Sequence, residues 1–345
     1  MRENKIYRIC LLPGDGIGSE VVAGAVEVLQ VLPLEFAFTR AEIGYGAYQK
    51  LGTPLPDETL EAIRASDAAL FGAVTTPPNL AEYFSPVVRM RQRLELYTNL
   101  RPIHSIPHAS SRAGVDLLIV RENSEGLYSG SERLEDKGER AITERIITRH
   151  GSERILRKAF DLARAGGRKC VHVVHKANVL RQTCGLFRAV ALEVVQDYPD
   201  IEMKEMLVDT CAMELVRAPE QFELIVTTNL FGDILSDEAC MLVGGLGVAA
   251  SGNIGEGAAV FEPVHGSAPN LAGTGQANPL ATILAAAMLL DYIGEEEQAG
   301  RVHAAAAACM SAGEVTADMG GKLSTQEAVQ AVIRNLQMVH TELSK

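Results

Sequence analysis

Short apolar runs alternate with amphipathic stretches along this chain. The runs at residues 6–12, 68–74, 117–120, 171–175 and 224–228 are rich in β-branched and aliphatic side chains. Continuous runs of this kind predict strands that are buried on both faces of a sheet. Apolar residues at helical spacing predict helices over residues 19–29, 56–65, 151–165, 185–197, 279–292 and 325–343. The alternation predicts βαβ units and an α/β fold with a largely parallel sheet.

Three local features refine this picture. Ser19 precedes the first predicted helical turn and is expected to act as its N-cap. Residues 129–148 are charged and lack helical periodicity, which predicts an excursion such as a β arm. Glycine is dense from Gly244 to Gly257, which predicts a chain reversal between elements.

Composition narrows the class of protein. A chain of 345 residues is too long for one compact core and favours two domains. A net charge of −12, 5% aromatic residues and no tryptophan argue against a nucleic-acid binder. The apolar tract at residues 281–290 is too short to cross a bilayer, so no membrane association is expected. The six cysteines have neither zinc-site nor CxxC spacing, which predicts reduced thiols in a cytoplasmic protein.

The segment Asn229-Leu-Phe-Gly-Asp233-Ile-Leu-Ser-Asp237 carries the most specific chemistry. It follows an apolar run, and a strand-to-helix transition there places Asp233 and Asp237 one turn apart on one helix face. Two such carboxylates repel each other unless a cation lies between them, and oxygen ligands suit Mg²⁺ or Mn²⁺. The alternative is a solvated first helical turn, where the helix dipole favours acidic side chains.

Two loops are glycine- or proline-rich. Residues 13–18, Pro-Gly-Asp-Gly-Ile-Gly, have GxGxG rather than GxGxxG spacing. This favours a tight strand-to-helix turn over a Rossmann dinucleotide fingerprint. Residues 262–271, Glu-Pro-Val-His-Gly-Ser-Ala-Pro-Asn-Leu, predict a rigid functional loop whose ligand the residues alone do not identify.

Basic side chains near predicted strand ends are candidates for anion binding. Arg91, Arg101 and Arg121 offer guanidinium forks that suit carboxylates, although a single arginine is more often a surface residue. Arg121 directly follows an apolar run, at the strand end where open α/β sheets bind ligands. Lys176 in His175-Lys176-Ala-Asn178 follows another run, and is either a general base or a lysine whose amine reaches water.

Taken in order, these motifs resemble the β-decarboxylating dehydrogenases, the family of isocitrate, homoisocitrate, 3-isopropylmalate and tartrate dehydrogenases. The resemblance runs from residues 11–18 to Thr316-Ala-Asp318-Met-Gly-Gly321, nearly the whole chain. It implies a two-domain α/β fold without a Rossmann unit. The first, cofactor-side domain would be discontinuous, at residues 1–97 and 246–345, and residues 98–245 would form the second domain, with the arm, the metal site and the dimer contacts.

The same resemblance implies an activity and a role for each site residue. The activity would be oxidative decarboxylation of a 3-substituted malate by an obligate homodimer, with a tetramer left open. Mg²⁺ or Mn²⁺ would be held by Asp233 and Asp237 together with the partner subunit's Asp209. The partner subunit's Lys176, with Asp209 close by as a further catalytic residue, would act in general base catalysis, and Tyr128 would protonate the enol carbon. The implied substrate-binding residues are Ser85, Arg91, Arg101, Arg121, Tyr128, Lys176 and Asn178. The implied cofactor-binding residues are Asn178, Glu262, His265, Gly266, Ser267, Ala268, Asn270, Leu271, Asn278 and Asp318.

The residues at four positions favour NAD as the cofactor. Members that use NADP resemble one another in having a lysine, two tyrosines and an arginine where this chain has Asn270, Leu271, Ala317 and Gly321. None of these four can pair with a 2′-phosphate. NAD-linked members usually have Asp at position 270; Asn270 keeps the hydrogen bonding and loses the repulsion of a phosphate, so discrimination against NADP is expected to be softer.

The substrate is expected to depend on the residues before Arg91, which face the variable substituent in this family. The run Tyr83-Phe84-Ser85-Pro86-Val87-Val88-Arg89 is most similar to homoisocitrate dehydrogenases. Isocitrate enzymes usually have Asn where this chain has Val87, so isocitrate ranks second and 3-isopropylmalate third. A non-catalytic regulatory subunit, as found in heteromeric isocitrate dehydrogenases, is the least favoured expectation because the arginines, Tyr128, Lys176 and the aspartates are all present.

Overall fold

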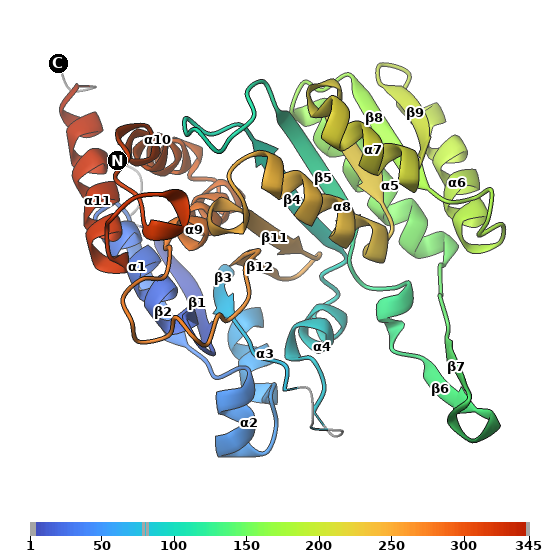
Figure 1. The fold of residues 1–345 in the computed structure, drawn as a ribbon, viewed down its shortest axis with the longest axis horizontal. Coiled ribbons are helices and arrows are strands. Elements are labelled where there is room, and N and C mark those ends of the chain that lie inside the picture. The colour runs from blue at the N-terminus through green and yellow to red at the C-terminus, as the bar shows by residue number, and fades with distance from the viewer. Residues whose placement is uncertain (1–4, 78–79, 81–82, 343–345) are drawn as a thin grey trace. The chain divides into compact units, whose positions relative to one another are not determined.

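The computed structural model describes residues 5–77, 80 and 83–342, and these residues form two compact units (Figure 1). The first unit comprises Met1–Leu94, Ser105–Ala113 and Val243–Lys345, and the second comprises Glu95–His104 and Gly114–Leu242. The domain boundaries expected from the sequence, 97/98 and 245/246, stay a prediction. Residues 1–4 and 343–345, which that prediction assigns to the first domain, lie outside the described residues.

The first unit contains five strands in the order β2-β1-β3-β12-β11. β1 pairs in parallel with β2 and β3, β3 pairs in parallel with β12, and β11 is antiparallel to β12. The strand bounds are β1 (Ile6–Gly14), β2 (Glu35–Arg40), β3 (Ala68–Ala73), β11 (Ala250–Ile254) and β12 (Ala259–Pro263). The helices are α1 (Gly18–Gln30), α2 (Tyr45–Leu51), α3 (Asp57–Arg64), α4 (Pro86–Arg93), α9 (Leu280–Tyr292), α10 (Glu296–Ala312) and α11 (Thr325–Glu342).

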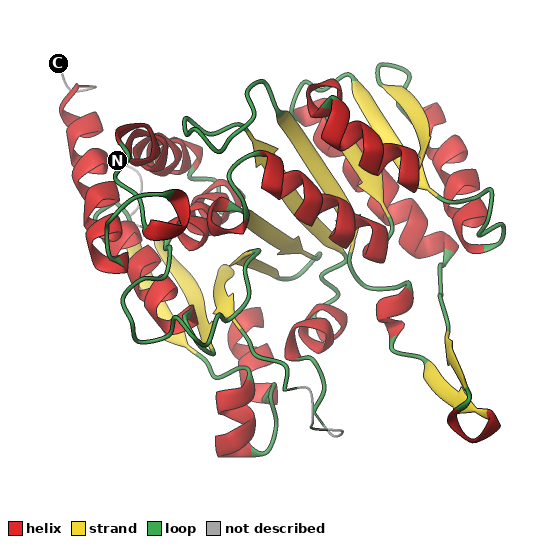
Figure 2. Ribbon diagram, viewed as in Figure 1, coloured by secondary structure: helices red, strands yellow, loops and turns green. Residues whose placement is uncertain are grey.

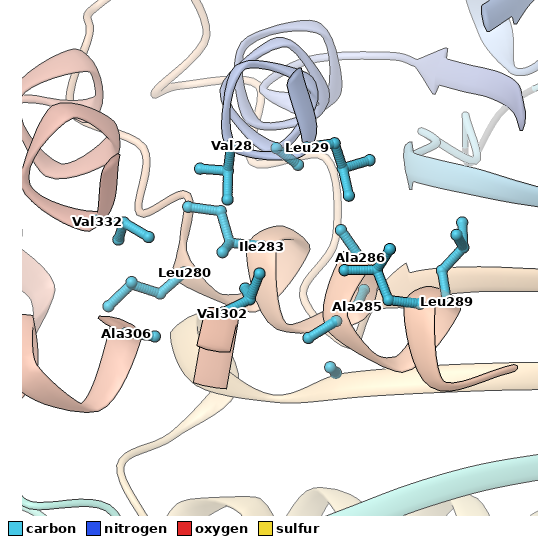
Figure 3. Packing of buried hydrophobic residues seen from close by; sticks show 14 of the residues in the cluster. Val28, Leu29, Leu280, Ile283, Ala285, Ala286, Leu289, Val302, Ala306 and Val332 are labelled. Carbon is cyan, nitrogen blue, oxygen red and sulfur yellow. The ribbon is translucent and has the colours of Figure 1, made fainter. Parts of the chain in front are cut away.

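The core of the first unit joins the two ends of the chain. Val28 and Leu29 of α1 pack with Ile283 of α9, as Figure 3 shows, together with Val302 of α10 and Val332 of α11. α9 is apolar on nearly every side, because it lies between the sheet and the neighbouring helices α1 and α10. Burying this surface ties the N-terminal strands to the C-terminal helices, so the first unit is discontinuous in sequence.

The second unit contains strands in the order β4-β5-β10-β8-β9. β5, β10, β8 and β9 are parallel, and β4 is antiparallel to β5. The strand bounds are β4 (Thr98–His104), β5 (Asp116–Glu122), β8 (Cys170–His175), β9 (Glu202–Leu207) and β10 (Leu224–Thr227). Helices α5 (Arg149–Ala165) and α6 (Thr183–Val194) pack together, as do α7 (Val208–Arg217) and α8 (Asn229–Leu242) (Figure 2).

A two-stranded ribbon extends from the second unit (Figure 1). β6 (Glu132–Glu135) pairs antiparallel with β7 (Arg140–Thr143), and the expected β arm is therefore confirmed. Short 3-10 helices complete the chain: η1 (Leu127–Ser129), η2 (Asp136–Gly138), η3 (Val195–Asp197), η4 (Pro219–Gln221), η5 (Leu246–Val248) and η6 (Ala317–Met319).

The predicted α/β class with a largely parallel sheet is confirmed, and each of the five predicted strands and six predicted helices is found. Residue 343, the last of the predicted C-terminal helix, lies outside the described residues. The six cysteines are free and buried. Within the described residues, no helix is both long and apolar enough to cross a membrane.

Two local predictions are wrong. Ser19 is not the N-cap of α1, because Ile17 precedes the helix and its N–H bonds the Ser267 carbonyl at 2.9 Å. The contact with a distant loop, rather than a capping side chain, sets where α1 begins. The glycine-dense segment 244–257 is more than a reversal, because it contains η5 and the whole of strand β11, which is mostly buried.

Candidate active site

The two aspartates of the central motif lie on α8, directly after β10. β10 is buried throughout, and α8 begins at Asn229, so the predicted strand-to-helix transition is confirmed. Asp233 and Asp237 are four residues apart in this helix and therefore face the same side, one turn from each other.

A guanidinium group lies between these two carboxylates. Arg101 of β4 donates from Nη1 to Oδ1 of Asp237 at 2.7 Å and from Nη2 to Oδ1 of Asp233 at 3.3 Å. Nη1 also donates to Oγ of Ser236 at 2.7 Å, and Nε donates to Oδ1 of Asn99 at 2.9 Å. Arg101 is buried, so its charge is balanced by carboxylates rather than by bulk water. The positive charge of Arg101 thus offsets the repulsion expected between the carboxylates of Asp233 and Asp237.

A second arginine reaches Asp233 from the end of β5. Arg121 is almost fully buried and forms an ion pair through Nη1 with Oδ1 of Asp233. Its Nε and Nη2 both donate to Oδ1 of Asn229, at 3.1 and 2.7 Å. The carboxyl end of a buried strand thus presents a guanidinium beside two α8 side chains.

Tyr128 completes this cluster. Its hydroxyl donates to Oδ2 of Asp233 at 2.6 Å, and the guanidinium of Arg121 lies 5.3 Å from the centre of its ring. Burial, together with the hydrogen bond to Asp233, raises the pKa of Tyr128. The hydroxyl therefore stays protonated at neutral pH, as a proton donor must.

Lys176 and Asp209 form a separate pair. Lys176 follows β8, and its ammonium group bonds the carboxylate of Asp209 at the start of α7. The hydrogen bond from Lys176 lowers the pKa of Asp209 and keeps it ionised. Asn178, two residues beyond Lys176, is exposed in the following turn.

Asp209 does not join Asp233 and Asp237 in a single subunit. Among the residues that the structure describes, no three His, Cys, Asp or Glu side chains gather closely enough to hold a metal ion. Asp233 and Asp237 offer the hard oxygen ligands that a divalent cation prefers, and an ion bound by this pair would take its other ligands from outside it.

In the first unit, Arg91 and Glu262 form a buried ion pair. Nη2 of Arg91, on α4, donates to Oε1 of Glu262, on β12, at 2.8 Å. Nδ2 of Asn253, on β11, donates to the same oxygen at 2.7 Å. Nε of Arg91 is buried and makes no hydrogen bond to any described residue. The guanidinium is thus fixed at one end and has a further donor available.

Ser85 has a local structural role. Its Oγ accepts from the N–H of Val88 at 3.4 Å and caps α4, while Pro86 occupies the first helical position. The guanidinium of Arg89 lies 4.7 Å from the centre of the Phe84 ring.

The loop after β12 contains most of the predicted cofactor residues. Oγ of Ser267 and Oγ1 of Thr75 are 2.7 Å apart, and the Ser267 carbonyl accepts from Ile17. The same loop contains five further predicted cofactor residues: His265, Gly266, Ala268, Asn270 and Leu271. Of these, Gly266, Asn270 and Leu271 are exposed.

The ring of His265 is oriented by the backbone of the next residue in this loop. Its Nδ1–H donates to the Gly266 carbonyl at 3.0 Å, and Nε2 is buried without a hydrogen-bond partner among the described residues. Burial lowers the pKa of His265, so the ring is neutral at pH 7. A neutral buried nitrogen of this kind fits a bound polar group.

Asn278 and Asp318 are brought together at the end of the same loop. Nδ2 of Asn278 donates to Oδ2 of Asp318 at 3.0 Å, and Oδ1 of Asn278 accepts from the N–H of Leu280 at 2.9 Å. Asp318 also accepts from Oγ1 of Thr316 at 2.5 Å. These bonds fix the start of α9 against the segment around η6.

Four residues that contact predicted site residues were not themselves predicted: Asn229, Gly232, Ser236 and Thr75. Asn229 directly follows a buried apolar run, and that position is the signal that could have identified it. Gly232 and Ser236 directly precede Asp233 and Asp237 in the same motif, whereas Thr75 reaches Ser267 only through folding and has no comparable signal.

Comparisons with known proteins agree on one family. The model described as isocitrate/isopropylmalate dehydrogenase matches residues 8–332. The chain is 50% identical over 332 residues to an isocitrate/homoisocitrate dehydrogenase from Thermus thermophilus, spanning 96% of this chain and 99% of the relative. It is 46% identical over 345 residues to a homoisocitrate dehydrogenase from Methanocaldococcus jannaschii, spanning 96% of this chain and 98% of the relative.

A solved structure agrees in fold. The crystal structure of isocitrate dehydrogenase from Methylococcus capsulatus matches with a TM-score of 0.92 and 44% identity, covering 96% of this chain and 99% of that one. The predicted isopropylmalate/isocitrate dehydrogenase-like fold is therefore confirmed. Members of this family generally use NAD(P) and a divalent metal. By sequence and by fold, the chain belongs to the isocitrate/isopropylmalate dehydrogenase family and is a decarboxylating hydroxy-acid dehydrogenase.

Proposed function

We propose that this enzyme is an NAD- and divalent-metal-dependent dehydrogenase that converts homoisocitrate to 2-oxoadipate. The observation that carries the proposal is the cluster of Arg101, Arg121 and Tyr128 around the α8 carboxylates. It combines two guanidinium groups for anionic substrate groups, oxygen ligands for a hard cation and a protonated phenol.

Each side chain has a defined task in this reaction. Arg91, Arg101 and Arg121 bind the substrate carboxylates and orient the reacting carbon. The partner subunit's Lys176, which lies beside Asp209, would act as the general base toward the 2-hydroxyl group, and NAD, when bound, would accept the hydride from C2. The 3-carboxylate then leaves as CO₂, and the Tyr128 hydroxyl donates a proton to the resulting enol carbon.

Asp233 and Asp237 would hold Mg²⁺ or Mn²⁺, with the partner subunit's Asp209 as a further ligand. When bound, such an ion makes the substrate hydroxyl more acidic and stabilises the enolate charge. The side chains fit this assignment because both are oxygen donors that lie one turn apart on the same helix.

Local geometry supports NAD over NADP. A Cβ placed on Gly321 would lie 1.8 Å from the carbonyl oxygen of Val315, so no larger side chain fits there without moving the backbone. Ala317 and Leu271 carry no positive charge. Lys322 is exposed beside Gly321, so we expect NAD to be preferred rather than NADP to be excluded.

We propose a homodimer that buries the α7–α8 face, defined here by Met213, Val216, Ile234 and Met241. Each of these side chains is more than half exposed in the single chain. An apolar group of this kind is typical of a subunit interface. A dimer also accounts for the absence of a third metal ligand beside Asp233 and Asp237 within the described part of one chain.

The choice of homoisocitrate rests on α4. Ser85 caps this helix, and Pro86, Val87 and Val88 form its first turn, which gives a mainly apolar surface. Arg89, held over Phe84, is the basic group available for a more distant carboxylate. The relatives named isocitrate/homoisocitrate and homoisocitrate dehydrogenase support this ranking.

The test is NADH formation with Mn²⁺ on homoisocitrate, isocitrate and 3-isopropylmalate in parallel, comparing kcat/KM. We expect homoisocitrate to be preferred, NADP to be a poorer acceptor than NAD, and a chelator to abolish turnover. A preference for isocitrate would mean that Ser85 suffices to recognise the shorter acid without the usual asparagine. No turnover of any of the three would contradict the proposed activity, and activity that survives the chelator would contradict the metal assignment.

A further inference from the structure

Asn229 occupies a central place in the cluster without contacting the reacting groups of the proposed mechanism. It is the first residue of α8 and is almost fully buried. Its Oδ1 accepts from Nε and Nη2 of Arg121, at 3.1 and 2.7 Å. Its Nδ2 donates to the backbone carbonyl of Glu125 at 3.1 Å. The Asn229 amide thus binds Arg121, a proposed substrate-binding residue, on one side and the backbone of the loop around Glu125 on the other.

That loop carries the proposed acid. Glu125 is three residues before Tyr128, and Gly126 between them has a φ of +85°, which turns the chain toward η1. Tyr128 bonds Asp233, and Asp233 pairs with Arg121. These contacts and the backbone of residues 125–128 together close a ring. Asn229 binds Arg121, Arg121 pairs with Asp233, and Asp233 accepts from Tyr128. The chain then leads from Tyr128 back to the Glu125 carbonyl, which accepts from Asn229.

The ring requires an amide at position 229. Oδ1 serves as an acceptor for a cation, while Nδ2 serves as a donor to a carbonyl, and few side chains of this size offer both. A carboxylate keeps the acceptor but repels the Glu125 carbonyl. An alanine leaves both the arginine donors and the carbonyl without their partner, which is costly in a buried position.

We propose that Asn229 is a positioning residue that sets Arg121 and Tyr128 relative to each other. It keeps the guanidinium of Arg121 and the phenol of Tyr128 in a fixed relative position, so protonation of the enol carbon depends on Asn229. This inference rests on the proposed function, because it assigns Tyr128 the final proton transfer.

The test compares Asn229→Asp and Asn229→Ala with the wild-type dimer and with Thr227→Val. Thr227 is the matched control, because its buried hydroxyl donates to the Val174 carbonyl at 2.8 Å and takes no part in the ring. Three quantities are measured: backbone amide hydrogen exchange over residues 123–129, KM for the preferred substrate, and deuterium incorporation at C3 of 2-oxoadipate and 2-oxoglutarate in D₂O with Mn²⁺ and NADH. The last reports enol protonation without net hydride transfer.

Asn229→Asp should speed amide exchange in the loop and slow C3 labelling, each about tenfold, with KM nearly unchanged because Arg121 keeps its acceptor. Asn229→Ala should show the same changes and also raise KM about tenfold, because Arg121 loses that acceptor. Thr227→Val should match the wild type in all three.

Two results would overturn the proposal. If Asn229→Asp matches Thr227→Val in C3 labelling, Asn229 does not govern the proton transfer, whatever the loop does. If amide hydrogen exchange over residues 123–129 is unchanged in both Asn229 variants, the Asn229 side chain does not hold this loop. Failure of the proposed function is distinguishable, because it leaves the wild type without C3 labelling, and amide exchange alone then decides whether Asn229 holds the loop.

Discussion

Arg121 shows how a single glycine can fix a functional side chain. A Cβ on Gly232 would lie 2.6 Å from Cγ and 2.7 Å from Cβ of Arg121. The arginine stem therefore passes directly over the α8 backbone, and no other residue type fits without displacing it. This close approach directs the guanidinium toward Asn229 and Asp233.

We expect Gly232→Ala to weaken substrate binding. The added methyl group pushes the stem of Arg121 away, which should raise KM about tenfold and lower the free energy of unfolding by about 1–3 kcal/mol. Steady-state kinetics and a denaturant titration measure the two effects.

Gly185→Ala is the matched control for this variant. Gly185 is also a helical glycine of the second unit, but a Cβ there would meet no atom within 4 Å. This substitution should leave KM unchanged and stabilise the protein by about 0.4–1 kcal/mol. Equal behaviour of the two variants would contradict the steric argument.

At the scale of elements, α7 and α8 each have a side that the single chain does not cover. Met213 and Val216 lie on α7, and Ile234 and Met241 lie on α8. The two helices pack against each other, so these side chains belong to neighbouring helices. The buried sides of α7 and α8 contain Cys211, Leu215, Leu235 and Ala239.

Met241→Lys should dissociate the proposed dimer. A lysine within the proposed apolar interface must be desolvated, and we expect the dissociation constant to rise at least about tenfold. Sedimentation velocity over a range of protein concentrations measures the change. Leu51→Lys on α2 is the control, because Leu51 is also exposed and apolar but belongs to the first unit. A wild-type monomer at micromolar concentration would contradict the proposal.

At the scale of the whole molecule, the proposed catalytic groups fall into two sets. Lys176 pairs with Asp209, and Asp233 pairs with Arg101 and Arg121. If each active site takes its lysine from the partner subunit, a defect in one set can be compensated by a second chain that is defective only in the other.

Mixed dimers of Lys176→Ala and Asp233→Asn should therefore regain activity that neither variant has alone. In a two-fold dimer, a mixed dimer has one intact site of two, which predicts roughly half of wild-type kcat for the isolated mixed species. Co-expression with two affinity tags isolates the mixed species for assay. Mixed dimers that form but stay inactive would show that Lys176 serves its own subunit.

The sequence by itself determined the elements whose signal is local. The apolar run of β8 and the helical spacing in α5 depend only on neighbouring residues, so both could be predicted. The separation of Asp233 and Asp237 by one turn follows from helix geometry alone. β9 is an edge strand with several exposed positions, and β11 is a buried strand of small and polar residues, so neither has an apolar run that predicts it.

Only the tertiary structure decided which partner each functional side chain has. Arg101 and Asp233 are separated by 132 residues, and Arg121 and Asn229 by 108. No local pattern encodes such pairings, because they arise when strand ends and α8 are brought together by burial of the core. The start of α1 was likewise set by a contact with Ser267 rather than by Ser19. Residue types and spacing thus fixed the available chemistry, and long-range packing fixed its geometry.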